Sequence, residues 1–386
     1  MDLIKKTNTF RKIRVNITDP HKVYHDIMYN INQFGRKTLG MDMMNLDFSF
    51  VNPRFIFLLI IMTSFLYADL ESSVLAEDLA GFAYNIAVLG FGLQGFAKFD
   101  AYIFRKKGMN TLIFKGSAIL AEHRNTERLK QIMIDSMAFN KMILKFYTFL
   151  YVMVFVIMSA FGILISLYSG RMQLSCGFQF SFIDTTRLPG YVATYIYQTT
   201  GVFMVAVSSF CNDVLITVLF VNALAMFDCI ISDLKELSKL SQLEKTPATR
   251  YAMSEQMKSL IKQHQYVLEY LNLSNKVFSL YFFMSLTCLT VAIAIMMIAL
   301  VWAHWYPGIF MSAVASFQIL ILCLLGTLLL MKEDELVREV YNVTWYDLDI
   351  EEQNSLRLML LMSQHFKEIS YRFGAMNVET YLKKSS

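Results

Sequence analysis

Few side chains in this sequence have the types and spacing that catalysis or metal binding requires. His21 and His25 stand four residues apart, which would place both imidazoles on one face of a helix, as in a metal-binding pair. No carboxylate or third ligand follows at a recognisable spacing. The sequence also lacks the Walker A, GxSxG and HExxH patterns of nucleotide-binding loops, serine hydrolases and zinc peptidases. We therefore expect no enzyme activity, no metal site and no cofactor.

Asp213 is the other residue that could do chemistry, because it interrupts a long apolar stretch. Pumps and secondary transporters place ionisable side chains near the middle of the membrane. Here Asp100, Asp213 and Asp228 all fall toward the predicted cytoplasmic ends of apolar runs, and the predicted midplane is nearly free of charge. We interpret Asp213 as lying where its helix leaves the membrane, with a functional carboxylate as the alternative.

The apolar runs are the elements that must position any functional residue. The 386-residue chain is 55% hydrophobic and only 17% charged, below the roughly 25% charged residues of soluble domains. Six uncharged runs are long enough, or nearly so, to cross a bilayer core of roughly 30 Å. The sequence therefore predicts an all-α, polytopic membrane protein. The runs cover residues 55–68, 79–97, 146–170, 188–212, 277–303 and 305–331.

Lysine and arginine residues divide the loops into two classes and so predict the orientation. Residues 1–54 are rich in them, as are the segments after the second and fourth runs, whereas the loops after the first, third and fifth runs are poor in them. By the positive-inside rule the N-terminus is cytoplasmic. The sequons at Asn16, Asn272 and Asn342 then lie on the cytoplasmic side, where they stay unmodified. We attribute the net charge of +4 to this topology and to contact with membrane lipid, and expect no nucleic acid as a partner.

The ends of these runs divide the chain into three regions. Residues 1–54 form a cytoplasmic N-terminal segment, and residues 55–331 contain transmembrane helices 1–6 with helix extensions into the cytoplasm. Residues 332–386 form a cytoplasmic segment, charged and amphipathic, that leads to the final helix.

The outer halves of the second to sixth runs have the composition of a binding pocket. They interleave small residues, which leave space, with aromatic and methionine side chains, which give a cavity an apolar, polarisable wall. Nothing charged is present there to bind an ionic ligand, so the pocket suits a small, neutral, volatile molecule. Close helix packing through small residues is the alternative at any one position. The predicted lining residues are Leu79, Phe82, Ala83, Ile86, Ala160, Gly162, Ser166, Tyr197, Gly201, Met204, Ala206, Phe310, Ala313 and Phe317.

The C-terminal third contains a pattern that resembles a known family. An aliphatic-C-x-x-G stretch late in the sixth run is followed by V-x-x-x-Y-x-x-x-W-Y and then by an amphipathic helix. This pattern resembles the C-terminal signature of insect odorant receptors. The short N-terminus, the long first cytoplasmic loop and the spacing of the runs are also similar to that family. The residues of the pattern are Cys323, Gly326, Val337, Tyr341, Trp345 and Tyr346.

The resemblance implies a seven-helix subunit of a tetrameric, non-selective cation channel in the plasma membrane of olfactory sensory neurons. It also implies an odorant receptor co-receptor as the partner subunit, with Tyr341, Trp345 and Tyr346 in the segment that contacts it. The co-receptor has a large insertion where residues 228–262 are short here, so we interpret this chain as a tuned, odorant-binding subunit.

One departure from the family pattern concerns the last helix, which lines the pore. The sequence reaches Ser386 about where that helix would begin, and roughly 20 more apolar residues would be needed to cross the bilayer. We therefore expect the pore helix to be missing from this chain, and prefer truncation to a variant that lacks it.

Two other receptor classes remain as alternatives. A G-protein-coupled receptor would have an extracellular N-terminus and would carry Asp-Arg-Tyr and Asn-Pro-x-x-Tyr motifs, which are absent at the corresponding spans. A gustatory-type receptor channel would carry a T-Y-x-x-x-x-x-Q-F motif in its last helix. The pattern at Tyr341 and Trp345-Tyr346 favours the odorant class.

Overall fold

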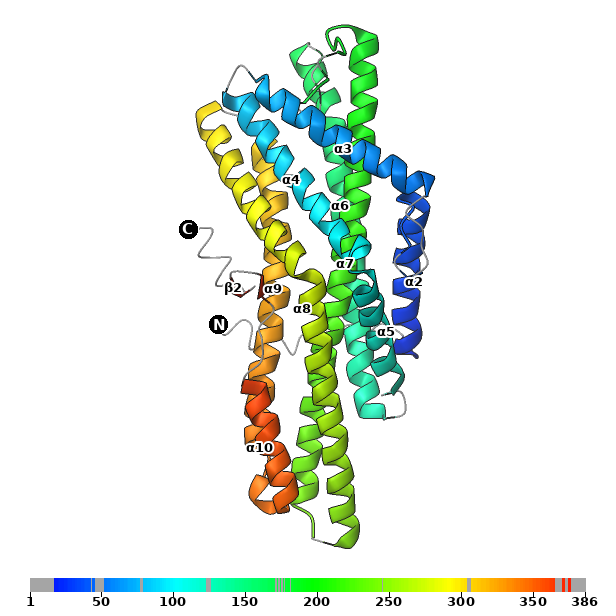
Figure 1. Cartoon of the computed structure of the whole chain (residues 1–386), viewed down its shortest axis with the longest axis vertical. Helices are drawn as coiled ribbons and strands as arrows, with labels where there is room; N and C mark the ends of the chain where they lie inside the picture. The colour runs from blue at the N-terminus through cyan, green and yellow to red at the C-terminus, as the bar shows by residue number, and fades with distance from the viewer. Residues whose placement is uncertain are drawn as a thin grey trace.

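The chain folds into long helices, most of which run nearly parallel to one axis (Figure 1). The computed structural model describes residues 17–42, 44–45, 52–76, 79–122, 126–170, 172, 174, 176, 178–180, 182–244, 246–303, 307–364, 370–371 and 374–375. The helices are α2 (Pro20–Thr38), α3 (Pro53–Val74), α4 (Leu79–Ile103), α5 (Lys106–Glu122), α6 (Glu127–Ser169), α7 (Leu188–Ser241), α8 (Pro247–Ala303), α9 (Pro307–Asn342), the short 3-10 helix η3 (Trp345–Asp347) and α10 (Ile350–Gln364).

The predicted all-α fold is confirmed. The strands in the described part are two residues long, β1 (Ser370–Tyr371) and β2 (Gly374–Ala375), and they pair antiparallel with Ser370 opposite Ala375. Five helices of the described residues, α3, α6, α7, α8 and α9, are long and apolar enough to cross a membrane. The 25-residue helix α4 covers the remaining predicted run.

Two of these helices extend well beyond the uncharged runs of the sequence. The first run was too short to span the bilayer alone, and α3 indeed begins before Arg54 and continues past Asp69. Its start is set by Pro53 at the first helical position and by Asn52, whose side chain accepts a hydrogen bond from the Arg54 amide. The fourth run continues without a break as α7, a helix of 54 residues.

Helix α7 forms the centre of the bundle, with α6, α8 and α9 packed around it (Figure 1). Helix α4 packs along α8, and α3 crosses α4 obliquely. Helices α2 and α5 pack on α7 from one side. We call the end formed by α10 and the turn between α7 and α8 the α10 end. We call the opposite end, where residues 170–187 join α6 to α7, the loop end.

The two histidines with metal-pair spacing, His21 and His25, both lie in α2. Asp19 caps the helix by accepting hydrogen bonds from the amides of His21 and Lys22. The His21 ring shares a hydrogen bond of 3.0 Å with the Ser117 hydroxyl on α5, whereas the His25 ring stacks on Tyr29. The two imidazoles therefore serve different contacts and do not form a pair.

Candidate ligand-binding cavity

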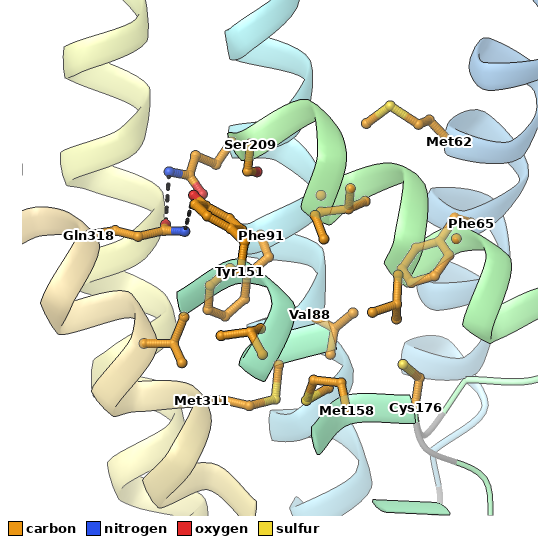
Figure 2. A pocket seen from close by; sticks show the side chains of 18 of the residues that line it. Met62, Phe65, Val88, Phe91, Tyr151, Met158, Cys176, Ser209, Met311 and Gln318 are labelled. Atoms are coloured by element: carbon orange, nitrogen blue, oxygen red, sulfur yellow. Dashed lines mark hydrogen bonds between the residues drawn. The ribbon is translucent and has the colours of Figure 1, made fainter. Parts of the chain in front are cut away.

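A partly open cavity of about 150 Å³ lies between the core helices, in the half of the bundle toward the loop end. Its wall comes from α3, α4, α6, α7 and α9 and is almost entirely apolar (Figure 2). Aromatic and sulfur-containing side chains converge on the space, which suits a ligand held by dispersion and burial more than by charge. Those that line it are Met62, Phe65, Phe91, Phe96, Tyr151, Met158, Cys176 and Met311.

Helical periodicity brings each group of lining residues onto one face. On α3 the wall consists of Ile61, Met62, Phe65 and Leu66, which are pairs spaced four residues apart. On α7 the lining residues between Gly201 and Ser209 follow the same spacing. Small residues on these faces leave the volume that larger side chains would fill.

Gly201 is a tightly packed point of this wall. A Cβ atom added there would lie 2.9 Å from Cδ2 of Phe65, so the ring of Phe65 packs directly over the glycine. Phe65 is held from its other side by an edge-to-face contact with Phe178, at 4.3 Å between ring centroids. The absence of a side chain at Gly201 therefore fixes the position of one aromatic wall.

Polar groups gather on one side of the cavity, where Figure 2 labels Tyr151, Ser209 and Gln318. Together with Gln94, which also lines the cavity, we call them the polar floor. The amide nitrogen of Gln318 lies 3.4 Å from the Tyr151 hydroxyl, and its amide oxygen lies 3.4 Å from the Gln94 nitrogen. Gln94 and Gln318 come from α4 and α9, so the floor also ties these helices together.

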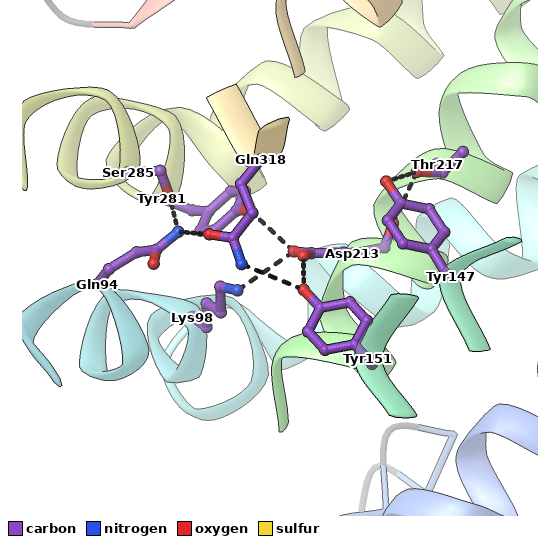
Figure 3. A network of polar contacts seen from close by, with 9 residues as sticks. All are labelled: Gln94, Lys98, Tyr147, Tyr151, Asp213, Thr217, Tyr281, Ser285 and Gln318. Carbon is purple, nitrogen blue, oxygen red and sulfur yellow. Dashed lines mark hydrogen bonds and ion pairs between the residues drawn. The ribbon is translucent and has the colours of Figure 1, made fainter. Parts of the chain in front are cut away.

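Below the polar floor lies a buried ion pair between Lys98 on α4 and Asp213 on α7 (Figure 3). The Lys98 Nζ atom is 3.3 Å from Asp213 Oδ1, and the two side chains are 1% and 9% exposed. The Tyr281 hydroxyl of α8 donates to the same carboxylate at 3.2 Å, and the Tyr151 hydroxyl of α6 also donates to it. Four helices thus meet at one carboxylate, and Gln318 connects α9 to it through Tyr151.

This pair gives Asp213 a buried partner, and the placement of the residue where its helix leaves the membrane stays a prediction. The carboxylate is enclosed by protein and has three donors. Its partner was missed because Lys98 directly follows the predicted run 79–97 and looks like a flanking charge. The packing of α4 against α7 brings the two together, and sequence spacing gives no signal of that contact.

The structure places two of the predicted pocket residues, Gly201 and Ala206, in the cavity wall. On α6, Ala160, Gly162 and Ser166 lie nearer the loop end than the wall residues Leu150 to Met158. Ser166 donates to the Gly162 carbonyl and shares a hydrogen bond with Tyr191.

The remaining predicted pocket residues lie around the cavity on the same helices. On α4, Phe82 is exposed on the outside, and Ala83 and Ile86 precede the wall residues that begin at Val88. The side chains of Leu79 and Phe310 lie outside the described residues.

On α7 and α9, Tyr197 is bound to the Ser64 hydroxyl at 2.7 Å, and Met204 packs on the main core. Ala313 is exposed, and Phe317 packs on Phe146. A ligand role for the predicted set stays a prediction.

Two contributions to the wall were absent from the prediction. The first is α3, whose apolar pairs at four-residue spacing could have indicated a buried face. The second is Cys176, from the connection between α6 and α7. Its backbone amide donates to Gln198 Oε1 at 3.0 Å, and Gln198 Nε2 donates to the Cys176 and Phe178 carbonyls. Gln198 thereby holds this connection against the cavity.

The aromatic residues predicted at the subunit contact lie on the surface near the α10 end. Tyr341, Trp345 and Tyr346 are 71%, 50% and 65% exposed, and the last two rings contact each other edge to face. Exposed aromatic clusters of this kind are typical of protein interfaces.

Comparisons with known proteins identify the family. The chain is 23% identical over 289 residues to "Putative odorant receptor 83c" of Drosophila melanogaster, covering 70% of this chain and 71% of that protein. Two solved structures of the insect olfactory receptor OR5 from Machilis hrabei share its fold, and the second is in complex with eugenol. Their TM-scores are 0.75 and 0.72 at 15% and 14% identity, and each comparison covers 95% of this chain and 96% of the other. The sequence model of the family described as 7tm Odorant receptor matches residues 78–384, and the chain belongs to this family.

Proposed function

We propose that this chain is the odorant-binding subunit of a heteromeric, odorant-gated, non-selective cation channel in the plasma membrane of olfactory sensory neurons. The observation that carries the proposal is the apolar cavity of about 150 Å³ between the helices of a chain that belongs to an odorant receptor family. An apolar cavity of about that size is large enough for a molecule such as benzene. The OR5 structure with eugenol supports a small organic ligand for this fold.

The chemistry of the wall favours neutral ligands. Burying an unpaired charge in apolar surroundings costs far more free energy than burying a neutral polar group. Lys98 and Asp213 already neutralise each other below the floor, so neither offers a free charge to a ligand. Acids and amines should therefore bind more weakly than neutral molecules of the same shape.

The proposal includes a partner and an orientation. An odorant receptor co-receptor subunit would complete the channel, and Tyr341, Trp345 and Tyr346 are proposed to contact it because they expose large aromatic surfaces. The N-terminus and the α10 end are proposed to be cytoplasmic, following the distribution of lysine and arginine in the loops.

Whole-cell current tests this function. Cells would express the chain with a co-receptor, the chain alone, or the co-receptor alone, and each would receive pulses of phenols, indoles, thiazoles and short esters. We expect an inward current only from the pair, and no comparable response to carboxylic acids or amines of matched size. A second tuned receptor expressed with the same co-receptor serves as the positive control. If that control responds and this pair responds to none of the panel, the proposal is wrong.

A further inference from the structure

The polar floor belongs to a chain of hydrogen bonds whose direction is set by the buried carboxylate. As a carboxylate, Asp213 can only accept hydrogen bonds. It lies beside the ammonium group of Lys98, and the hydroxyls of Tyr281 and Tyr151 are both bound to it (Figure 3). The single hydroxyl proton of Tyr151 is therefore used at Asp213.

This direction fixes the orientation of the next amide in the chain. Because the Tyr151 proton is already used, its oxygen can only accept from Gln318, so the Gln318 nitrogen must face Tyr151 at 3.4 Å. The Gln318 oxygen then faces Gln94, whose nitrogen donates to it at 3.4 Å and to the Ser285 hydroxyl at 3.5 Å. The network thus determines which end of each glutamine is the donor, a choice that bond lengths alone do not make.

One acceptor is left over at the end of this chain. The two N–H groups of Gln94 point to Gln318 and Ser285, and its Oε1 atom points away from both (Figure 3). Gln94 is 3% exposed and lines the cavity. The hydrogen bonds that its side chain makes to described residues both go through Nε2, so Oε1 is left to accept from a donor in the cavity. An acceptor at the wall of an apolar cavity gains a hydrogen bond when the ligand carries a donor, and it loses its interactions with water when the ligand carries none.

We propose that the cavity selects neutral ring compounds that carry one O–H or N–H donor, and that this donor binds Gln94 Oε1. The inference rests on the proposed function, since it makes this cavity the odorant site, and it narrows the ligand class to phenols, small aromatic alcohols and N–H heterocycles. The Ser209 hydroxyl, also on the floor, can rotate to donate or accept and so does not discriminate. The competing arrangement is a ligand acceptor bound to the second N–H of Gln318, and the probes below separate the two.

Binding of three monocyclic probes to the purified full-length chain in lipid nanodiscs tests the inference. Phenol and toluene have nearly the same shape but differ in the donor, and benzaldehyde carries an acceptor only. The readout is the ratio of the Kd values of toluene and phenol, measured by equilibrium dialysis, for the wild type and for Gln94→Met. Taking the ratio within each protein and comparing the two proteins cancels the difference in hydrophobicity between the probes.

We expect Gln94→Met to reduce the preference for phenol over toluene by a factor of about two to ten, as the loss of one neutral hydrogen bond implies. Phe91→Leu, in the apolar wall, is the matched control and should change the Kd of both probes by the same factor. An unchanged ratio in Gln94→Met overturns the inference. Should that variant fail to fold, the wild type decides: phenol binding more tightly than benzaldehyde supports the inference, and the reverse order assigns the contact to Gln318 and overturns it.

The two proposals fail in different ways. Odorant-evoked current without a donor preference refutes the donor site and leaves the channel function standing. Phenol binding with the expected ratio, but no current from any pair, refutes the channel function and leaves the donor site standing. Binding of none of the three probes removes the cavity as a ligand site and with it the donor site.

Discussion

Replacing Asp213 by Asn keeps the shape of the side chain and removes the negative charge at the meeting point of the core helices. Lys98 would then hold an ammonium group that is 1% exposed and has no counter-charge within 4 Å among the described residues. Removing one partner of a buried ion pair costs about 3–5 kcal/mol, because the remaining charge stays buried. We therefore expect Asp213→Asn to lose about 3–5 kcal/mol of unfolding free energy.

A second substitution tests whether the stranded charge causes this loss. Replacing both members of a buried pair by neutral residues of similar volume is often close to neutral. The double variant Lys98→Met with Asp213→Asn should therefore recover most of the loss and lie within about 2 kcal/mol of the wild type. The measurement is denaturant unfolding in mixed micelles, with the two single variants and the double variant forming a mutant cycle.

An exposed ion pair provides the matched control. Lys115 and Glu269 lie 2.6 Å apart, but Glu269 is 68% exposed, so Lys115→Met should cost only about 0–1 kcal/mol. If Asp213→Asn loses no more unfolding free energy than Lys115→Met, the Lys98 ammonium group without its partner does not destabilise the protein. If the double variant loses the sum of the two single losses, Lys98 and Asp213 are not coupled. Either result would refute the reasoning from burial.

Three further predictions concern ligand, partner and orientation. Gly201→Ala pushes against Phe65, and because overpacking costs about 1–3 kcal/mol it should raise the odorant EC50 about tenfold. Thr200→Ala, at a half-buried neighbour outside the cavity wall, should leave the EC50 unchanged. Trp345→Ala should reduce co-purification with the co-receptor by about tenfold or more, as for an aromatic interface anchor, without changing the recovery of the chain itself. An N-terminal epitope tag should stain only permeabilised cells and Asn342 should carry no glycan; staining of intact cells would favour the G-protein-coupled receptor topology.

The sequence predicts where helices lie but not what covers them. The most apolar stretches of α6 and α7 are almost equally apolar, yet 6% of the α6 stretch is buried inside the protein and 89% of the α7 stretch. In a membrane protein, lipid and protein are equally good surroundings for an apolar side chain, so hydropathy cannot separate an outer helix from a central one. The cavity face of α3 differs from this case, because the four-residue spacing of its apolar pairs could have indicated it.

The depth of the cavity was unpredictable for a related reason. Aromatic and methionine side chains occur throughout the apolar part of α6, so composition could not decide between the turn at Ala160 and the turn at Val154. The helix rotations and the crossing of α3 decide it, because they bring Phe65 against Gly201. The polar floor was equally hidden, because Gln94 and Gln318 are far apart in the sequence and each alone resembles a tolerated polar residue in a membrane helix.

The unbroken course of α7 has a mechanical consequence. Gly201 lines the cavity and Ser241 ends the helix near the α10 end, so about 60 Å of continuous helix separates the ligand from the far end of the molecule. Treated as a straight rod, a helix of that length multiplies a small rotation: a tilt of about 2° at the cavity moves the far end by about 2 Å. A ligand that shifts the cavity wall by only a fraction of an ångström can therefore produce a larger displacement at the far end of α7. That end lies beside Thr344, near the exposed Tyr341 and Trp345.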